Sequence, residues 1–227
     1  MMRVAIAGAG RMGQSIASVL EGNDDLEHVG TWSRGDDLNA LVAGADVLID
    51  FSLPGATDQI LDSVERYGRA LVCGVSGLSD DQVARFAEAA NLIPVVYDRN
   101  MSLGVAILER SVRMAAASLG ADAEVRISEV HHVHKKDAPS GTALQLGEAI
   151  ASVRGEAGTG SVVFESERRG EVPGDHEVVL ETPTERLTFA HSVTTRQVFA
   201  EGAVRAAAWV VGQSPGLYKM RDLLFEH

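Results

Sequence analysis

The first hundred residues alternate short apolar segments with stretches of helical periodicity, and this alternation limits the possible folds more than any other feature. Apolar strands are expected at residues 4–7, 29–32, 47–51, 70–73 and 93–97. Helices are expected between them, at 12–20, 54–67 and 79–90. Strands that alternate with helices form parallel sheets with helices on both faces, and continuous apolar strands fit burial on both sides. The sequence therefore predicts an α/β fold that begins with a parallel sheet.

The pattern changes near residue 100. Helices are expected at 103–118 and 141–153, and strands at 124–132, 162–167, 176–182 and 185–192. Strands in hairpin-like succession indicate a smaller α+β domain with a mixed or antiparallel sheet. Residues after about 197, with helical periodicity at 201–211 and a last segment at 220–225, are too few for a domain of their own. We therefore predict one domain at 1–102 that is completed by 197–227, and a second at 103–196.

The charge balance restricts the partners of this chain. Its 227 residues include 20 Lys and Arg against 32 Asp and Glu, so the formal charge is 20 − 32 = −12. This charge argues against nucleic-acid binding and against docking on an anionic membrane. No apolar segment approaches the roughly 20 residues that span a bilayer, and the N-terminus lacks the pattern of a signal peptide. The single cysteine, Cys73, allows no internal disulfide, and we expect a soluble cytoplasmic protein.

A glycine motif follows the first expected strand. Residues 8–13 read Gly8-Ala9-Gly10-Arg11-Met12-Gly13, which matches G-x-G-x-x-G between a strand and a helix. In such a motif the first glycine permits a tight turn, the second lets the backbone approach a pyrophosphate, and the third lets helix and strand pack closely. The helix N-terminus offers free N–H groups to the phosphates. The motif predicts a Rossmann-type dinucleotide-binding domain.

The end of the second strand bears on the choice of nucleotide. An NAD site usually has an acidic residue there for the ribose 2′-hydroxyl, but this chain has Ser33 and Arg34 after Trp32. Arg34 is suited to the 2′-phosphate of NADP, or is an ordinary surface residue. Asp36 and Asp37 follow closely, so an NAD site that uses one of these carboxylates stays open as an alternative. We expect the cofactor to be NADPH and/or NADH. The absence of an acidic residue after Trp32 favours acceptance of NADPH.

Two other strands end in short polar or glycine-containing segments. They read Asp50-Phe51-Ser52-Leu53-Pro54 and Gly74-Val75-Ser76-Gly77. Because α/β sheets bind ligands at the carboxyl ends of their strands, both segments are candidates for cofactor contact. Ordinary turns between strand and helix are the alternative.

The residues best suited to chemistry lie at 128–143. This segment contains three of the seven histidines and two lysines, followed by a helix that begins near Pro139 and Ser140. A metal site is one interpretation, since His132 and His134 share a strand face near Glu129, but Lys135 and Lys136 would repel a cation. A solvated basic loop is another. We favour an acid/base loop for an anionic substrate, because histidine, lysine and a helix N-terminus converge there.

The segment His131-His132-x-His134-Lys135-x-Asp137-Ala138-Pro139-Ser140-Gly141-Thr142-Ala143 resembles the signature of the 4-hydroxy-tetrahydrodipicolinate reductase (dihydrodipicolinate reductase) family. Similarity extends along the chain, at 4–13, 49–54, 74–78, 100–104, 199–205 and 216–222. The resemblance implies NAD(P)H-dependent reduction of the dehydrated imine of (2S,4S)-4-hydroxy-2,3,4,5-tetrahydrodipicolinate to tetrahydrodipicolinate, in lysine and diaminopimelate biosynthesis. It also implies a homotetramer whose contacts, with the substrate site, belong to the middle domain.

The resemblance assigns roles to individual residues. His131 and Lys135 would be catalytic, and no metal is implied. His132, Gly141, Thr142 and Arg196 would bind substrate, while direct contacts of His134 and Lys136 stay open. The cofactor would be bound by Gly8, Ala9, Gly10, Arg11, Met12, Gly13, Ser33, Arg34, Phe51, Ser52, Gly74, Val75, Ser76, Asn100 and Met101.

The sequence departs from the family pattern on the cofactor side. The family's glycine turn commonly has one more residue, and its usual acidic residue after the second strand is replaced here by Ser33. Two alternatives stay open: a nucleotide-sensing inactive paralogue, and an aspartate- or homoserine-type dehydrogenase. Neither predicts the segment from Asp137 to Thr142, and the first would be expected to lack His131 or Lys135.

Overall fold

The computed structural model describes residues 1–225, so the last two residues of the expected C-terminal completion lie outside the described part. The chain divides into two compact units. Unit 1 comprises Met1–Ser102 and the chain from Gln197 onward, and unit 2 comprises Leu103–Arg196. No helix in the described residues has both the length and the apolar character needed to cross a membrane.

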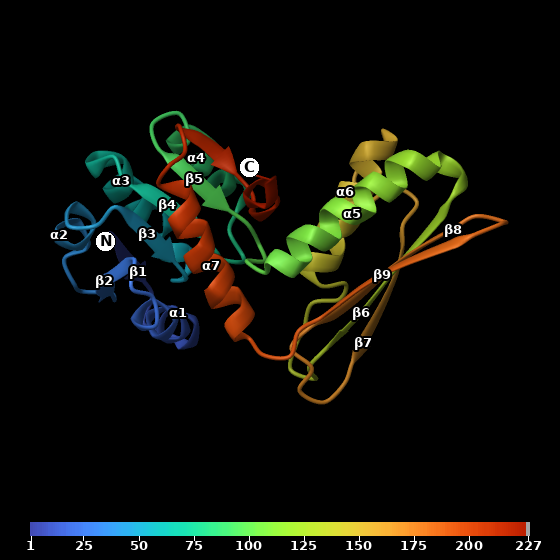
Figure 1. Cartoon of the computed structure of the whole chain (residues 1–227), viewed down its shortest axis with the longest axis horizontal. Helices are drawn as coiled ribbons and strands as arrows, with labels where there is room; N and C mark the ends of the chain where they lie inside the picture. Colours follow the sequence, from blue (N-terminus) through green and yellow to red (C-terminus); the bar gives the residue numbers. More distant parts are fainter. Residues whose placement is uncertain (226–227) are drawn as a thin grey trace. The chain divides into compact units, whose positions relative to one another are not determined.

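Unit 1 is a six-stranded parallel sheet with helices on both faces (Figure 1). The strand order is β10-β5-β4-β3-β1-β2. The strands are β1 (Met2–Ala7), β2 (Leu26–Trp32), β3 (Val47–Asp50), β4 (Ala70–Cys73), β5 (Pro94–Tyr97) and β10 (Gly216–Tyr218). The helices are α1 (Arg11–Glu21), α2 (Leu38–Ala43), α3 (Thr57–Tyr67), α4 (Asp80–Ala89) and α7 (Gln197–Val210), with 3₁₀ turns η1 (Pro54–Ala56) and η3 (Met220–Phe225).

The apolar strands of unit 1 are buried as their sequences predict. Every residue of β3 and β4 is buried, because α1 and α7 pack together on one face while α2, α3 and α4 form a row on the other. The strand register aligns Ala7 with both Trp32 and Asp50, and Asp50 with Cys73. The loops that follow these four strands therefore leave the sheet at one edge, where ligands bind in folds of this type.

Unit 2 is a four-stranded mixed sheet with the order β7-β6-β8-β9. The strands are β6 (Glu124–His131), β7 (Val163–Arg168), β8 (Asp175–Glu181) and β9 (Arg186–Ser192). The helices are α5 (Leu103–Leu119) and α6 (Gly141–Arg154), with the 3₁₀ turn η2 (Gly120–Asp122) after α5. Strand β7 runs parallel to β6, whereas β8 and β9 are antiparallel to their neighbours.

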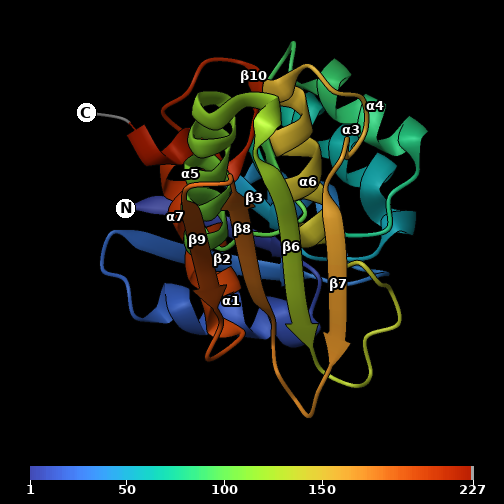
Figure 2. The same cartoon turned by 90° about the vertical axis from the view of Figure 1, so that its right-hand side faces the viewer.

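The two helices of unit 2 lie behind a single face of its sheet (Figure 2). Val125 and Ile127 of β6 contribute to a core with Val178 and Leu180 of β8 and apolar residues of α5 and α6. The residues that alternate with these two along β6, Glu124 and Arg126, are exposed on the other face. This alternation agrees with a sheet that is buried on one side.

Two short elements escaped prediction from the sequence. Helix α2 has six residues, too few for its hydrophobic pattern to repeat. It is defined by its ends: the Asp37 side chain accepts a hydrogen bond from the Ala40 N–H, and Gly44 follows. Strand β10 has three residues and extends the sheet by pairing with β5. Both depend on contacts with the rest of unit 1 more than on local pattern.

Candidate active site

The glycine motif of unit 1 forms a tight turn between β1 and α1. Gly8 has φ +105°, and a Cβ there would lie 2.6 Å from the Phe51 carbonyl oxygen. A Cβ on Gly13 would lie 1.8 Å from the Gly8 carbonyl oxygen, whereas a Cβ on Gly10 would meet nothing within 4 Å. The first and third glycines are thus required by packing, and Gly10 faces open space beside the N-terminus of α1.

A cavity of about 330 Å³ opens beside this turn. It is lined by Gly8, Ala9, Gly10, Trp32, Ser33, Arg34, Phe51, Ser52, Leu53 and Ala56. The hydroxyl of Ser52 is buried and has no hydrogen-bond partner in the described structure. Free backbone N–H groups at the start of α1, an open position at Gly10 and an unsatisfied hydroxyl suit a bound dinucleotide.

The acidic residues near the second strand are engaged in hydrogen bonds within their own loop. The Asp36 carboxylate accepts a hydrogen bond from the Ser33 N–H at 2.9 Å, and Asp37 caps α2. Neither lines the cavity, whereas Ser33 and Arg34 do. The cavity edge thus presents a hydroxyl and an exposed guanidinium.

The remaining expected cofactor residues follow other strands of unit 1. Gly74 packs so closely under the Phe51 ring that a Cβ would lie 2.4 Å from it. Val75 is buried and Ser76 is exposed beyond it. Asn100 and Met101 follow β5, where the Asn100 side chain accepts a hydrogen bond from the Ser102 N–H at 2.9 Å. Arg11 and Met12 lie in the first turn of α1.

A second polar centre lies at the end of β6 in unit 2. The Nδ1 of His131 hydrogen-bonds to Oε2 of Glu129, whose side chain is fully buried. Arg168 at the end of β7 donates to both oxygens of this carboxylate, each at 3.0 Å. These three side chains share the sheet face that carries the core, because strand residues two apart point the same way.

Arg168 also holds the loop that follows β6. Its Nε donates to the Lys135 carbonyl at 3.2 Å, and its Nη2 donates to the Asp137 carbonyl. The Lys135 ammonium lies 2.8 Å from the Asp137 carboxylate, and the Lys135 side chain is 22% exposed. These contacts hold the loop so that Lys135 lies near the polar centre.

The N-terminus of α6 completes the polar centre. Ser140 caps this helix, its hydroxyl accepting a hydrogen bond from the Ala143 N–H, while its own N–H donates to Glu129 Oε1 at 3.3 Å. A Cβ on Gly141 would meet nothing within 4 Å, so the first turn of α6 faces open space there. Thr142 follows in the same turn and is partly buried. This end of α6 suits a carboxylate.

His176 of β8 closes another side of the centre. Its Nε2 lies 3.2 Å from the Ser140 hydroxyl, and its ring lies edge-on to that of His131, with centroids 5.2 Å apart. Burial, together with the nearby His131, lowers the pKa of His176 to about 3. His176 is therefore neutral at physiological pH.

Burial also lowers the pKa of His131, against the opposing effect of Glu129. For Glu129, burial alone would raise the pKa, but hydrogen bonds from Arg168, Ser166 and His131 outweigh it and hold the pKa below its ordinary value. Glu129 is therefore ionised, and its charge is balanced by Arg168.

The other expected substrate residues lie at the margin of this centre. Strand β6 ends at His131, so His132 and His134 lie in the following turn and not on a strand face, with ring centroids 6.0 Å apart. His134 is largely exposed and pairs with Glu171 at 3.3 Å. Lys136 is exposed, and so is Arg196, the last residue of unit 2.

Two family models together match nearly the whole chain. "Dihydrodipicolinate reductase, N-terminus" matches residues 2–101, and "Dihydrodipicolinate reductase, C-terminus" matches residues 104–224. The chain belongs to the dihydrodipicolinate reductase family. It is therefore an oxidoreductase with NAD(P)H as cofactor, and the cavity beside Gly10 fits that group.

Curated relatives support the same family over their full length. The 4-hydroxy-tetrahydrodipicolinate reductase of Hahella chejuensis is 38% identical over 264 aligned positions, which cover 99% of each chain. The enzyme of the same name from Caulobacter vibrioides is 42% identical, over 98% of this chain and 97% of its own.

Solved structures agree in fold. A dihydrodipicolinate reductase from Paenisporosarcina sp. TG-14, solved with dipicolinate bound, matches 99% of this chain with a TM-score of 0.85 at 22% identity. An aspartate dehydrogenase from Thermotoga maritima matches with a TM-score of 0.56 at 13% identity. The chain thus shares its fold with an aspartate dehydrogenase, a type of enzyme that the sequence left open as an alternative.

Glu129, Arg168 and His176 belong to the polar centre but lie outside the reductase signature, which assigns them no role. A sequence signal for Glu129 exists, because alternation in β6 places it on the face of Val125, Ile127 and His131. The contacts of Arg168 and His176 depend on the pairing of β7 and β8 with β6, which a single sequence does not reveal.

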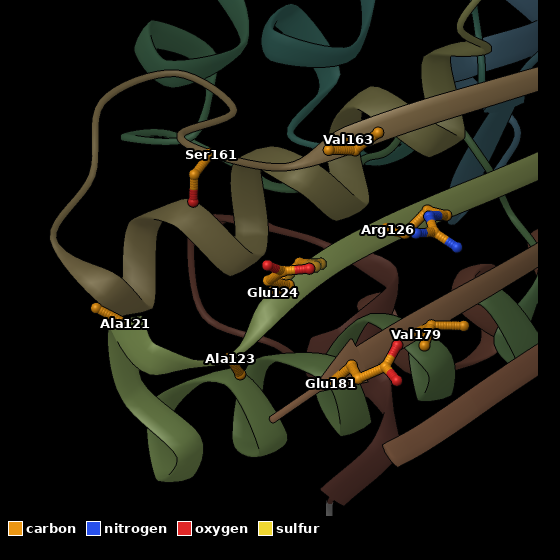
Figure 3. Close-up of a pocket in the computed structure, with 9 residues that line it drawn as sticks. Ala121, Ala123, Glu124, Arg126, Ser161, Val163, Val179 and Glu181 are labelled. Carbon is orange, nitrogen blue, oxygen red and sulfur yellow. The ribbon is translucent and has the colours of Figure 1, made fainter. Parts of the chain in front are cut away.

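A larger cavity, about 450 Å³, lies at the other end of β6 on the open face of the unit 2 sheet (Figure 3). Glu124, Arg126, Val179 and Glu181 line it, with residues from the start of β7 and around η2. Figure 3 shows their side chains projecting from neighbouring strands of this face. The cavity contains no part of the centre around His131.

Proposed function

We propose that this chain reduces the dehydrated imine of (2S,4S)-4-hydroxy-2,3,4,5-tetrahydrodipicolinate, as a cytoplasmic homotetramer, with His131 and Lys135 as its acid/base pair. This is the reductase step of lysine and diaminopimelate biosynthesis. In a chain of this family, one observation carries the assignment: His131 and the α6 N-terminus both contact the buried Glu129 carboxylate, and Arg168 links the Lys135 loop to the same carboxylate.

The cofactor residues would hold the nucleotide in unit 1. The backbone around Gly8, Gly10 and Gly13 and the N-terminus of α1 would hold the pyrophosphate, while Ser33 and Arg34 would lie at the adenosine ribose. The chemistry that the nicotinamide supplies when bound is a hydride for one end of the substrate's conjugated C=C–C=N system. Phe51 and Ser52 line the same cavity as the glycine turn.

The residues of unit 2 would stabilise the charge that develops on the substrate. Negative charge moves towards the ring nitrogen and the adjacent carbon, so a positive partner and a proton are needed. Lys135 would polarise the imine or donate a proton, and His131 would act as the general acid/base through its Nε2. His132 and Arg196 would contact the substrate.

A substrate carboxylate is expected at the start of α6. Its partners would be the N–H groups of Gly141 and Thr142 and the Thr142 hydroxyl, reinforced by the helix dipole. Pyridine-2,6-dicarboxylate, the ligand in the Paenisporosarcina structure, is expected to inhibit competitively against the imine.

Replacement Thr142→Val is expected to raise the substrate KM more than it changes the nucleotide Kd, because it removes one hydroxyl from the carboxylate site. Steady-state kinetics and nucleotide titration measure the two quantities. Thr184→Val, in the exposed turn after β8, is the matched control. If pyridine-2,6-dicarboxylate inhibits competitively only against the nucleotide, the placement of the substrate carboxylate at the start of α6 is contradicted.

Nucleotide preference is expected to depend on Arg34. Asp36 accepts a hydrogen bond from the Ser33 N–H and Asp37 caps α2, and neither carboxylate lines the cavity. We therefore expect NADPH to be used at least as well as NADH. Arg34→Ala is expected to weaken NADPH binding by about 1.5–3 kcal/mol, the value of one charge-assisted hydrogen bond, with little change for NADH. Fluorescence titration measures both, with Arg66→Ala on the exposed side of α3 as the control. Equal losses for the two nucleotides would mean that Arg34 does not contact the 2′-position.

The decisive test of the activity is a coupled assay. The preceding synthase, supplied with pyruvate and aspartate semialdehyde, generates the substrate in place, and oxidation of NADPH or NADH is followed by absorbance. Synthase-dependent oxidation is the expected result. Nucleotide binding without turnover would instead identify a nucleotide-sensing paralogue.

The open face of the unit 2 sheet is the proposed tetramer contact. Its outward side chains include Val163, which is 55% exposed, beside the charged Glu124 and Arg126. The apolar side chains of this face would form the core of the contact, and its charged side chains would lie at the polar rim. Sedimentation equilibrium measures the assembly state directly.

A further inference from the structure

We propose that Glu129 and Arg168 are positioning residues for the acid/base pair. Glu129 fixes His131 in the tautomer with its proton on Nδ1, and Arg168 anchors both Glu129 and the loop that carries Lys135. This inference rests on the proposed function, because it takes His131 and Lys135 as the groups that act on the substrate.

The contacts of Glu129 determine the tautomer. Its Oε1 accepts from Arg168 Nη2 at 3.0 Å and from the Ser140 N–H at 3.3 Å. Its Oε2 accepts from Arg168 Nη1 at 3.0 Å and faces His131 Nδ1. An ionised carboxylate only accepts hydrogen bonds, so the His131 nitrogen that faces it must carry a hydrogen. In the neutral ring, Nε2 is then unprotonated.

Proton exchange is thereby confined to Nε2. This nitrogen points away from Glu129, towards the backbone at Gly174, where a Cβ would lie 3.0 Å from it. A second proton on the ring would enter and leave at Nε2, while Glu129 stabilises the imidazolium from the other side. A glycine at 174 keeps side-chain atoms away from this nitrogen.

Arg168 couples the tautomer to the position of Lys135. One guanidinium group bonds both carboxylate oxygens of Glu129 and also the carbonyls of Lys135 and Asp137. The Arg168 side chain is only 21% exposed, and its planar set of donors fixes all these acceptors relative to one another. A lysine at this position would retain the charge but could not make the same set of contacts.

The groups around His131 define its electrostatic setting. Glu129 on β6 favours the charged ring, whereas Lys135 of the loop and Arg168 of β7 disfavour it. His176 on β8 lies edge-on to the ring and is neutral. Glu129 is thus the one anion in this set, so its substitution is expected to change both the tautomer and the titration of His131.

Glu129→Gln tests the tautomer directly. The Oε1 position faces two fixed donors, Arg168 Nη2 and the Ser140 N–H, whereas the Oε2 position faces one fixed donor, Arg168 Nη1, and the His131 ring, whose tautomer can change. The amide oxygen is therefore expected at the Oε1 position and the amide NH₂ group next to His131. The ring must then accept at Nδ1 and carry its proton on Nε2. Imidazole ¹⁵N NMR is expected to show this inversion, and kcat is expected to fall by about 10²–10⁴-fold, as when the carboxylate that orients a catalytic histidine becomes an amide.

The matched control is Glu167→Gln. Glu167 is exposed on β7 and lies 3.6 Å from Arg169, and its substitution is expected to leave kcat and the His131 tautomer unchanged. Arg168→Lys is expected to keep the Nδ1–H tautomer while lowering kcat at least about tenfold through misplacement of Lys135. An unchanged kcat in Arg168→Lys would overturn the part assigned to Arg168.

Two outcomes would overturn the part assigned to Glu129. The first is an Nε2–H tautomer in the unmodified protein, which needs no variant and so does not depend on how well one folds. The second is near-normal kcat in Glu129→Gln while His131→Gln is inactive, which refutes this inference alone. Near-normal kcat in both variants would instead refute the acid/base role of His131 in the proposed function.

Discussion

Replacement of His131 by glutamine is expected to lower kcat by about 10²–10⁴-fold, the usual loss when a positioned general acid is removed. The factor corresponds to roughly 3–5 kcal/mol of transition-state stabilisation. Glutamine retains hydrogen-bonding capacity towards Glu129 but cannot gain and release a proton. The nucleotide Kd is expected to stay nearly constant, because the glycine turn belongs to unit 1 and His131 to unit 2.

The pH dependence of kcat/KM provides a second measurement. Burial lowers the pKa of His131, so the proton-donating form is lost as pH rises through a midpoint below the ordinary histidine value. This limb is expected to disappear in His131→Gln. His134→Gln, on an exposed side chain paired with Glu171, is the matched control and should leave the profile unchanged. Near-normal turnover in His131→Gln would refute the acid/base role.

The fold was predictable to the extent that hydrophobic periodicity specifies it. Buried strands such as β3 and β4 are continuous apolar segments, and the alternation of strand and helix required a parallel sheet. The mixed sheet of unit 2 was left open between two arrangements, since register between distant strands is a tertiary property. Helix α2 and strand β10 were missed because each is too short for a repeating hydrophobic pattern to show in its sequence.

The candidate site was predictable only where residues lie close together in sequence. His131, Lys135 and Thr142 come from one segment whose composition and family resemblance mark it. Arg168 lies 39 residues from Glu129, yet it donates to both oxygens of that carboxylate. Such contacts arise from strand pairing, so the network that orients His131 becomes visible only in three dimensions.

Lys135→Ala is expected to lower kcat by a factor similar to that of His131→Gln, about 10²–10⁴-fold. The Lys135 ammonium is partly buried and paired with Asp137, on a loop that Arg168 holds at two carbonyls. Alanine removes the cation that would polarise the imine while leaving those backbone contacts available. The nucleotide Kd is again expected to be nearly unchanged, and stopped-flow measurement of nucleotide oxidation separates chemistry from binding.

The control for Lys135 is its neighbour. Lys136 is exposed, and Lys136→Ala removes the same charge from the same loop, so only a mild effect is expected. If His131 and Lys135 serve one proton-transfer step, the double variant should lose less than the product of the two single losses, because the second substitution removes a group whose partner is already absent. A severe Lys136 phenotype beside a mild Lys135 phenotype would reverse the assignment. Fully multiplicative losses would mean that the two residues act in separate steps, with Lys135 as an electrostatic partner of the substrate and His131 as the sole proton carrier.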